Sequence, residues 1–206
     1  EGIRPSWNVA PSSTIRGILR RDGAKRLEAL RWGLVPSWSK SVSGGAKMIN
    51  ARSETLDRSP AYRSALTRRR AVIPMDGFYE WRREPGQAPQ PFYFCSTDGE
   101  PLAAAGLWDV WRDPSSDGPW LLSAVIITTA ATEPVVQVHS RMPVLLRLSM
   151  VDEWLGVGSG DADPALGLLA ARASQVALDA RPVSRSVNSV SNDSPELVLG
   201  IGPGSH

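Results

Sequence analysis

The chain has 206 residues, a formal net charge of +2 and a single cysteine, Cys95. This length suits one full-sized domain, and no Pro/Gly/Ser-rich linker divides the chain. A lone cysteine excludes an intramolecular disulfide framework and a thiolate metal cluster, and it favours a reducing, cytoplasmic location. No apolar run of the sequence is long enough to span a bilayer, so we expect no membrane contact.

The predicted elements begin with a hairpin. Residues 13–19 and 26–32 alternate apolar and polar side chains, and the Asp-Gly pair between them is a strong turn signal. A proline-containing loop is expected over 33–39. A short helix is predicted at 60–69, because a serine and a proline precede it and arginines gather in its last turn.

Further along the chain, helices are predicted at 149–155 and 163–172. Runs rich in β-branched and aromatic residues predict strands at 92–95, 102–108, 121–129, 176–180 and 183–187. Strands and helices do not alternate as βαβ units. We therefore predict an α+β fold: one domain over residues 1–199, with a largely antiparallel, barrel-like sheet core and a few short helices, followed by a flexible tail over 200–206.

The stretch AVIPMDGFYEW, residues 71–81, holds the most informative carboxylate. It is expected to turn at 74–77 and then to place Glu80 among Phe78, Tyr79 and Trp81. Burial among aromatic rings disfavours a charged carboxylate, so the pKa of Glu80 would rise and the group becomes a candidate general acid or base. The alternative is that Glu80 lies on the solvent face of a half-buried strand.

Two other segments carry candidate polar groups. His139 lies in VHSRMP, where a loop would aim it into a cleft, with Arg141 on the same side if the segment is extended. A satisfied structural histidine is the alternative. In MINARSET, Asn50 and Arg52 share one face of an extended segment and together suit a phosphate, although a polar network that fixes two loops explains this motif equally well.

Some kinds of site are excluded by the sequence. Metal ligands are too few and wrongly spaced, and neither a P-loop nor a dinucleotide fingerprint occurs, so we expect no cofactor. A Ser-His-Asp hydrolase stays open on composition, although the sequence contains no Gly-x-Ser-x-Gly elbow.

A series of motifs across nearly the whole chain resembles the SOS-response-associated peptidase (SRAP) family of abasic-site processing proteins. In order, the motifs are WNVAPS (7–12), RWGLVPSW (31–38), INARSET (49–55), VIPMDGFYEW (72–81), ITTAAT (127–132), VHSRMPVLL (138–146) and VNSVSNDSPEL (187–197). One match alone is weak, but the series in register is specific. The resemblance implies an α+β domain with a barrel-like core and a positively charged groove for sharply bent single-stranded DNA.

In that family an N-terminal cysteine attacks the ring-opened aldehyde of an abasic site, and its amine and thiol close a thiazolidine crosslink. The resemblance implies that Glu80 donates and accepts protons, that His139 assists opening of the sugar, and that Asn50 positions the terminal amine. It further implies AP-lyase and self-processing peptidase activities.

The resemblance also assigns the DNA contacts. Arg52 and Arg141 would hold phosphates that flank the lesion. Stacking on bases, or wedging between them, is expected from Trp81, Trp32, Trp38 and Pro11. Simple core packing remains the alternative for the aromatic residues. The expected partner is single-stranded DNA with abasic sites, bound by a monomer at the nucleoid.

The sequence departs from the family at its start. The opening motif Cys-Gly-Arg-Phe does not occur, and Glu1 lies only shortly before WNVAPS. Cys95 does not replace the missing cysteine, because it lies in an apolar run and has no free α-amine. We expect either that a first segment is missing here or that the protein is a degenerate, noncatalytic binder of single-stranded DNA. The intact Asn50, Glu80 and His139 favour the first; a peptidase limited to trimming its own start is a third hypothesis.

Overall fold

The protein is built around a closed ring of strands, seen in a computed structural model that describes residues 4–156, 163–172 and 176–202. The ring contains β1 (Thr14–Arg21), β2 (Ala24–Trp32), β4 (Arg70–Met75), β7 (Leu102–Trp111) and β8 (Leu121–Ala130). They pair in the order β1–β2–β8–β7–β4 and back to β1, with β2–β8 parallel and the other pairs antiparallel. The predicted α+β class with a largely antiparallel, barrel-like core is confirmed.

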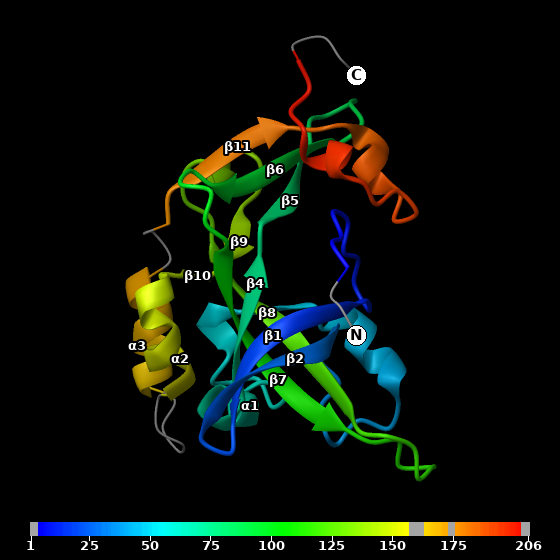
Figure 1. Ribbon diagram of the computed structural model, residues 1–206, viewed down its shortest axis with the longest axis vertical. Coiled ribbons are helices and arrows are strands. Elements are labelled where there is room, and N and C mark those ends of the chain that lie inside the picture. The colour runs from blue at the N-terminus through cyan, green and yellow to red at the C-terminus, as the bar shows by residue number, and fades with distance from the viewer. Residues whose placement is uncertain (1–3, 157–162, 173–175, 203–206) are drawn as a thin grey trace.

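Short strands extend the barrel at its edges. Both β3 (Asn50–Arg52) and β9 (Arg141–Pro143) pair with β8, while β10 (Leu145–Leu146) pairs with β7. A separate three-stranded antiparallel sheet of β5 (Gly77–Arg82), β6 (Gln90–Ser96) and β11 (Leu178–Pro182) lies above the barrel in Figure 1. The predicted strands at 92–95, 102–108 and 121–129 are thus confirmed as β6, β7 and β8.

Helices cover part of the barrel. The α-helices are α1 (Arg63–Arg68), α2 (Val151–Gly156) and α3 (Asp163–Arg172), of which α2 and α3 lie side by side on one flank (Figure 1). Short 3₁₀ turns are η1 (Val42–Lys47), η2 (Ser53–Thr55), η3 (Val135–Gln137), η4 (Leu148–Met150), η5 (Arg185–Asn188) and η6 (Pro195–Val198). The helix predicted at 60–69 is shorter than expected, because the chain forms only turns before Arg63. The strand predicted at 183–187 is wrong: Val183 forms only an isolated bridge with Gly200, and η5 begins at Arg185.

Side chains at alternate positions of the barrel strands are buried in two different hydrophobic clusters. Each strand of the ring contributes to one cluster, as Leu19, Leu30, Ile73, Ala104 and Ile126 do. The opposite faces of β4, β7 and β8 contribute to a second cluster together with the helices, and this cluster includes the fully buried Trp154 of α2. Burial on both faces explains why these strands read as nearly continuous apolar runs in the sequence.

The predicted hairpin is formed by β1 and β2, which pair from Thr14 with Arg31 to Arg21 with Ala24. Its two-residue turn places Asp22 at φ 51° and Gly23 at φ 77°, both in the left-handed region that Asp and Gly tolerate best. The turn signal in the sequence therefore set the register of the hairpin.

The stretch 71–81 connects the barrel to the small sheet. A turn was predicted at 74–77, but Pro74 belongs to β4 and pairs with Ala103, and the chain passes into β5 after a single bent residue. A Cβ atom at Gly77 would lie 2.4 Å from the carbonyl oxygen of Phe94, so only glycine fits this crossing. The same strand run thus carries Glu80 away from the barrel and out to the small sheet.

The two ends of the described chain are fastened together. The Asn8 side chain donates to the carbonyl oxygens of Val187, Ser189 and Asn192, each at 3.0 Å. In return, Asp193 accepts from the backbone N–H of Asn8 at 3.1 Å. The motifs WNVAPS and VNSVSNDSPEL therefore form one clasp beside the small sheet.

The domain boundary expected at residues 199 and 200 stays a prediction. The backbone of Ile201 donates to Pro182 at 2.9 Å, and Gly200 pairs with Val183. Residues 203–206 of the expected tail lie outside the described residues.

Candidate functional site

Glu80 lies on β5 with its side chain on the face shared by Phe78. Antiparallel pairing sets Glu80 directly opposite Phe92 of β6, and Phe78 opposite Phe94. Successive side chains of a strand point to opposite faces, so Tyr79 lies on the other side of the sheet. The sequence predicted Tyr79 and Trp81 as aromatic neighbours of Glu80. The structure instead sets Phe92 of the neighbouring strand opposite Glu80.

Burial raises the pKa of Glu80 above its ordinary value, and the charge of His139 opposes that rise. The side chain keeps 24% of its surface exposed, so the carboxyl group is partly buried yet remains accessible. The alternative, a glutamate on an open solvent face, does not describe this position. A carboxyl group with a raised pKa at an accessible edge is suited to proton transfer.

His139 faces this carboxyl group from the loop between η3 and β9. Its Nδ1 atom lies 3.5 Å from Oε2 of Glu80. The backbone N–H of Arg141 lies 3.2 Å from Nδ1, and the carbonyl oxygen of Arg141 lies 3.0 Å from it. Nδ1 therefore accepts from the N–H in the neutral ring with the proton on Nε2, and donates to the carbonyl oxygen when protonated. Either state keeps the ring in place beside Glu80.

Asn50 and Arg52 project from β3 on its exposed face, with Ala51 buried between them. The shared face predicted from their spacing is confirmed. Within the part of the chain that the structure describes, neither side chain has a hydrogen-bond or ion-pair partner. An amide and a guanidinium without protein partners are available to a ligand.

Arg141 is held differently. Its Nη1 and Nη2 atoms donate to the two carboxylate oxygens of Glu54 at 2.6 and 3.0 Å. Nη2 also donates to the carbonyl oxygen of Thr128 at 2.6 Å. The polar network that the sequence offered as an alternative for Asn50 and Arg52 does not include them: of that motif only Glu54 is bonded, and its partner is Arg141. Arg141 as a phosphate ligand stays a prediction.

The predicted base-stacking residues occupy distinct environments. Trp38 is 68% exposed and Pro11 is exposed. Trp32 is half-buried against the barrel cluster, where its Nε1 donates to the carbonyl oxygen of Ile49 at 3.0 Å. Trp81 packs beside Tyr79 and donates to Asn188 at 2.7 Å. Trp32 and Trp81 are thus partly packed against other residues, whereas Trp38 has a largely exposed surface, and base stacking by these residues stays a prediction.

A sequence profile described as "SOS response associated peptidase (SRAP)" matches residues 1–190. The chain belongs to the SRAP family. Among its relatives, "Abasic site processing protein YoqW" of Bacillus subtilis is 41% identical over 94% of this chain and 85% of that protein. "Abasic site processing protein HMCES" of Gallus gallus is 34% identical over 96% of this chain and 67% of that protein. "Abasic site processing protein YedK" of Escherichia coli is 30% identical over 95% and 84% respectively.

Solved structures show the same fold. A protein from Bacteroides thetaiotaomicron superposes with a TM-score of 0.78 at 25% identity, covering 92% of this chain and 82% of that one. A protein from Bordetella bronchiseptica superposes with a TM-score of 0.71 at 28% identity, covering 85% and 86%. The barrel and small sheet described above are therefore the SRAP fold.

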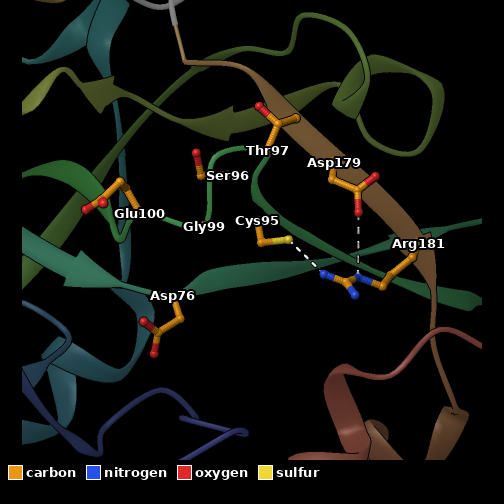
Figure 2. Close-up of a pocket in the computed structure, with 8 residues that line it drawn as sticks. All are labelled: Asp76, Cys95, Ser96, Thr97, Gly99, Glu100, Asp179 and Arg181. Carbon is orange, nitrogen blue, oxygen red and sulfur yellow. Dashed lines mark hydrogen bonds and ion pairs between the residues drawn. The ribbon is translucent and has the colours of Figure 1, made fainter.

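Cys95 lies away from this SRAP site. It neighbours Phe94 on β6, so it lies on the face of the sheet opposite to Phe92 and Glu80. Its Sγ atom is 2.9 Å from Nη2 of Arg181, in the shallow pocket shown in Figure 2. The expectation that Cys95 does not serve as the nucleophile agrees with this placement.

Two further findings concern metal binding and membrane spans. Across the described ranges, no group of three or more His, Cys, Asp or Glu side chains is arranged to hold a metal ion. None of the described helices is both long and apolar enough to cross a membrane.

Sequence reasoning missed Phe92 and did not assign a role to Glu54. The first is set opposite Glu80 only by the β5–β6 register, and the second meets Arg141 only because β3 and β9 both pair with β8. The one available signal for Glu54 was an acidic residue two positions after NAR.

Proposed function

We propose that this protein processes abasic sites in single-stranded DNA by forming a covalent crosslink with the lesion. The facing pair of Glu80 and His139 is the observation that carries the proposal. Support also comes from membership of the SRAP family and from relatives that bear the name abasic site processing protein. The reaction needs proton donors and acceptors at one point, which this pair supplies.

The chemistry begins with the sugar. Opening the ring moves a proton from the C1′ hydroxyl to the ring oxygen and leaves an aldehyde at C1′. A neutral amine then adds to C1′ and water leaves, which gives an imine. Addition of a thiol across the imine closes a thiazolidine and returns a proton to nitrogen. Glu80 delivers and removes these protons, and His139 assists at the ring oxygen.

The proposed nucleophile is the cysteine of the Cys-Gly-Arg-Phe motif, which the 206 residues do not contain. It must carry both a free α-amine and a thiol, a combination that Cys95 inside β6 does not offer. We assign the nucleophile to the native protein and the positioning of its amine to Asn50, whose amide is exposed and has no partner among the described residues.

Single-stranded DNA is the proposed partner, bound by a monomer. Arg52 is exposed and has no partner within the described chain. Trp38, the last residue of RWGLVPSW, is also exposed. A guanidinium binds phosphate and an indole stacks on any base, so this pair suits recognition without sequence preference. The imine also permits strand cleavage by β-elimination, and the same acid and base would serve self-processing of the N-terminus.

The test begins with the intact mass and first residue of the native protein. The native protein is then incubated with an abasic single-stranded oligonucleotide at neutral pH, beside the 206-residue chain. We expect a denaturation-resistant protein–DNA band from the former only, provided its first residue is cysteine. Equal, salt-sensitive binding to abasic and intact strands without any adduct would instead identify a noncatalytic binding protein.

A further inference from the structure

The Glu54–Arg141 pair is a two-point clamp. Both terminal nitrogens of the guanidinium donate to both oxygens of one carboxylate, at 2.6 and 3.0 Å. Parallel bonds of this kind fix the plane of the guanidinium as well as its distance. The third anchor is Thr128, whose carbonyl oxygen takes a further bond from Nη2 at 2.6 Å. Nε of Arg141 is buried and has no acceptor among the described atoms.

This clamp joins the parts of the site that come from different strands. Glu54 lies in η2, two residues after Arg52, and Arg52 pairs with Thr128 of β8. Arg141 begins β9, which pairs with the same end of β8. The clamp thus ties the segment that bears Asn50 and Arg52 to the strand that follows His139.

The backbone of Arg141 is also what holds the His139 ring. Its N–H and C=O lie 3.2 and 3.0 Å from Nδ1, the atom that faces Glu80. His139 is bonded at its backbone only through its N–H to the carbonyl oxygen of Val135 at 2.9 Å, within the described contacts. A shift of Arg141 would therefore move the ring relative to Glu80.

We infer that Glu54 is a positioning residue of the site, which holds Arg141 by the two-point clamp and thereby keeps His139 in line with Glu80. The inference rests on the proposed function for its kinetic consequence. Glu54 does not touch the reacting atoms and acts through Arg141 alone. The same Arg141 bonds lower the pKa of Glu54 to about 2, so the carboxylate is charged at every physiological pH.

A purely structural or purely electrostatic role predicts different behaviour. The Glu54 side chain is 49% exposed, and Arg141 keeps its bond to the Thr128 carbonyl oxygen when Glu54 is replaced, so we expect the variant to remain folded. Glu54 also neutralises Arg141 and occupies the N–H groups that a phosphate would use. Removal of Glu54 should therefore tighten DNA binding while it slows the chemistry, a combination that neither misfolding nor simple charge repulsion produces.

The experiment compares Glu54→Gln with Asp57→Asn in the native protein. Asp57 lies three positions further along, pairs with Arg58 and not with Arg141, and its change alters the net charge equally. With saturating abasic oligonucleotide, we expect the first-order rate of adduct formation to fall about 10-fold in Glu54→Gln, while the dissociation constant for intact single strands falls about 2-fold or more. Asp57→Asn should keep the wild-type rate.

A second measurement does not depend on the crosslink. The NMR signals of the His139 ring, and the nuclear Overhauser contacts of the ring with the Arg141 backbone, are compared at one pH in the DNA-free 206-residue chain. We expect both to change in Glu54→Gln but not in Asp57→Asn. Unchanged ring signals and contacts, or a rate at saturation within twofold of the wild type, overturn the inference. If the wild-type native protein makes no adduct at all, the proposed function fails, and the NMR comparison alone then decides the role of Glu54.

Discussion

Nδ1 of His139 lies 3.5 Å from Oε2 of Glu80, although the strands β6, β7 and β8 separate the two residues in the chain. The contact forms because the chain passes from β4 of the barrel into β5 of the small sheet, while the loop before β9 returns beside β8. A carboxyl group whose pKa is raised by burial thus meets an imidazole that is held by backbone bonds. Such a pair is able to pass a proton between the carboxyl group and the imidazole ring.

Replacing Glu80 by glutamine should slow adduct formation about 10²-fold or more, because the proton donor is lost and the shape of the side chain is kept. The dissociation constant for single-stranded DNA should stay within about twofold of the wild type. Single-turnover gels and fluorescence anisotropy measure the two quantities. Glu84→Gln, in the exposed loop after β5, is the matched control. A large loss of affinity in Glu80→Gln would instead show that Glu80 has a structural role.

Removing His139 should raise the pKa of Glu80 further. Burial raises this pKa while the positive charge of His139 lowers it, so His139→Ala leaves only the first effect. NMR titration of the ¹³C-labelled carboxyl group of Glu80 checks the direction. A lower Glu80 pKa in the variant would show that the two groups do not interact as their 3.5 Å separation indicates.

Arg52→Ala should weaken binding to all single strands alike. The guanidinium is exposed and unpaired within the described chain. Its loss should therefore remove one phosphate contact that no other group replaces. We expect the slope of log K against log salt to fall by about 0.7. Arg147→Ala, an exposed arginine beyond β10, should leave that slope unchanged. Equal slopes for Arg52→Ala and the wild type would remove Arg52 from the interface.

Two asparagines should separate stability from activity. Asn8→Ala removes bonds to three carbonyl oxygens of the clasp and should lower the free energy of unfolding by about 2 kcal/mol. Asn50→Ala should change it by less than about 0.5 kcal/mol, because its exposed amide has no partner among the described residues. Adduct formation should be slowed by Asn50→Ala instead. Urea unfolding and the crosslinking assay report the two effects, and the reverse pattern would contradict both assignments.

The pH dependence of stability should have opposite signs for the two site carboxylates. The pKa of Glu80 is raised above 4.5, so its contribution to the free energy of unfolding is present below pH 4.5 and is lost as pH rises through the folded value. The pKa of Glu54 is lowered to about 2, so its contribution is present above pH 4.5 and is lost as pH falls toward 2.

Urea unfolding of the Gln variants across this pH range measures both contributions. The free energy of unfolding of the wild type minus that of Glu54→Gln should shrink on acidification. The free energy of unfolding of the wild type minus that of Glu80→Gln should decrease as pH rises. Parallel curves for either variant would mean that the corresponding pKa is unshifted in the folded protein.

The sequence by itself determined the features that depend on neighbouring residues. The Asp22-Gly23 turn set the β1–β2 hairpin, because only a few residues adopt positive φ without strain. The alternation of β3 put Asn50 and Arg52 on one face, because side chains in a strand repeat every two residues. The motif series identified the family, because seven short motifs occur in order along nearly the whole chain, and the match of the family profile to residues 1–190 agrees with it.

Only the tertiary structure decided which distant residues meet. Phe92 lies directly opposite Glu80 through the register of β5 and β6, and Glu54 reaches Arg141 because β3 and β9 both pair with β8. Pro74 reads locally as a turn, yet pairing with β7 keeps it in β4. Register and closure of a barrel are chosen by the burial of the whole set of strands, so no local pattern encodes these contacts.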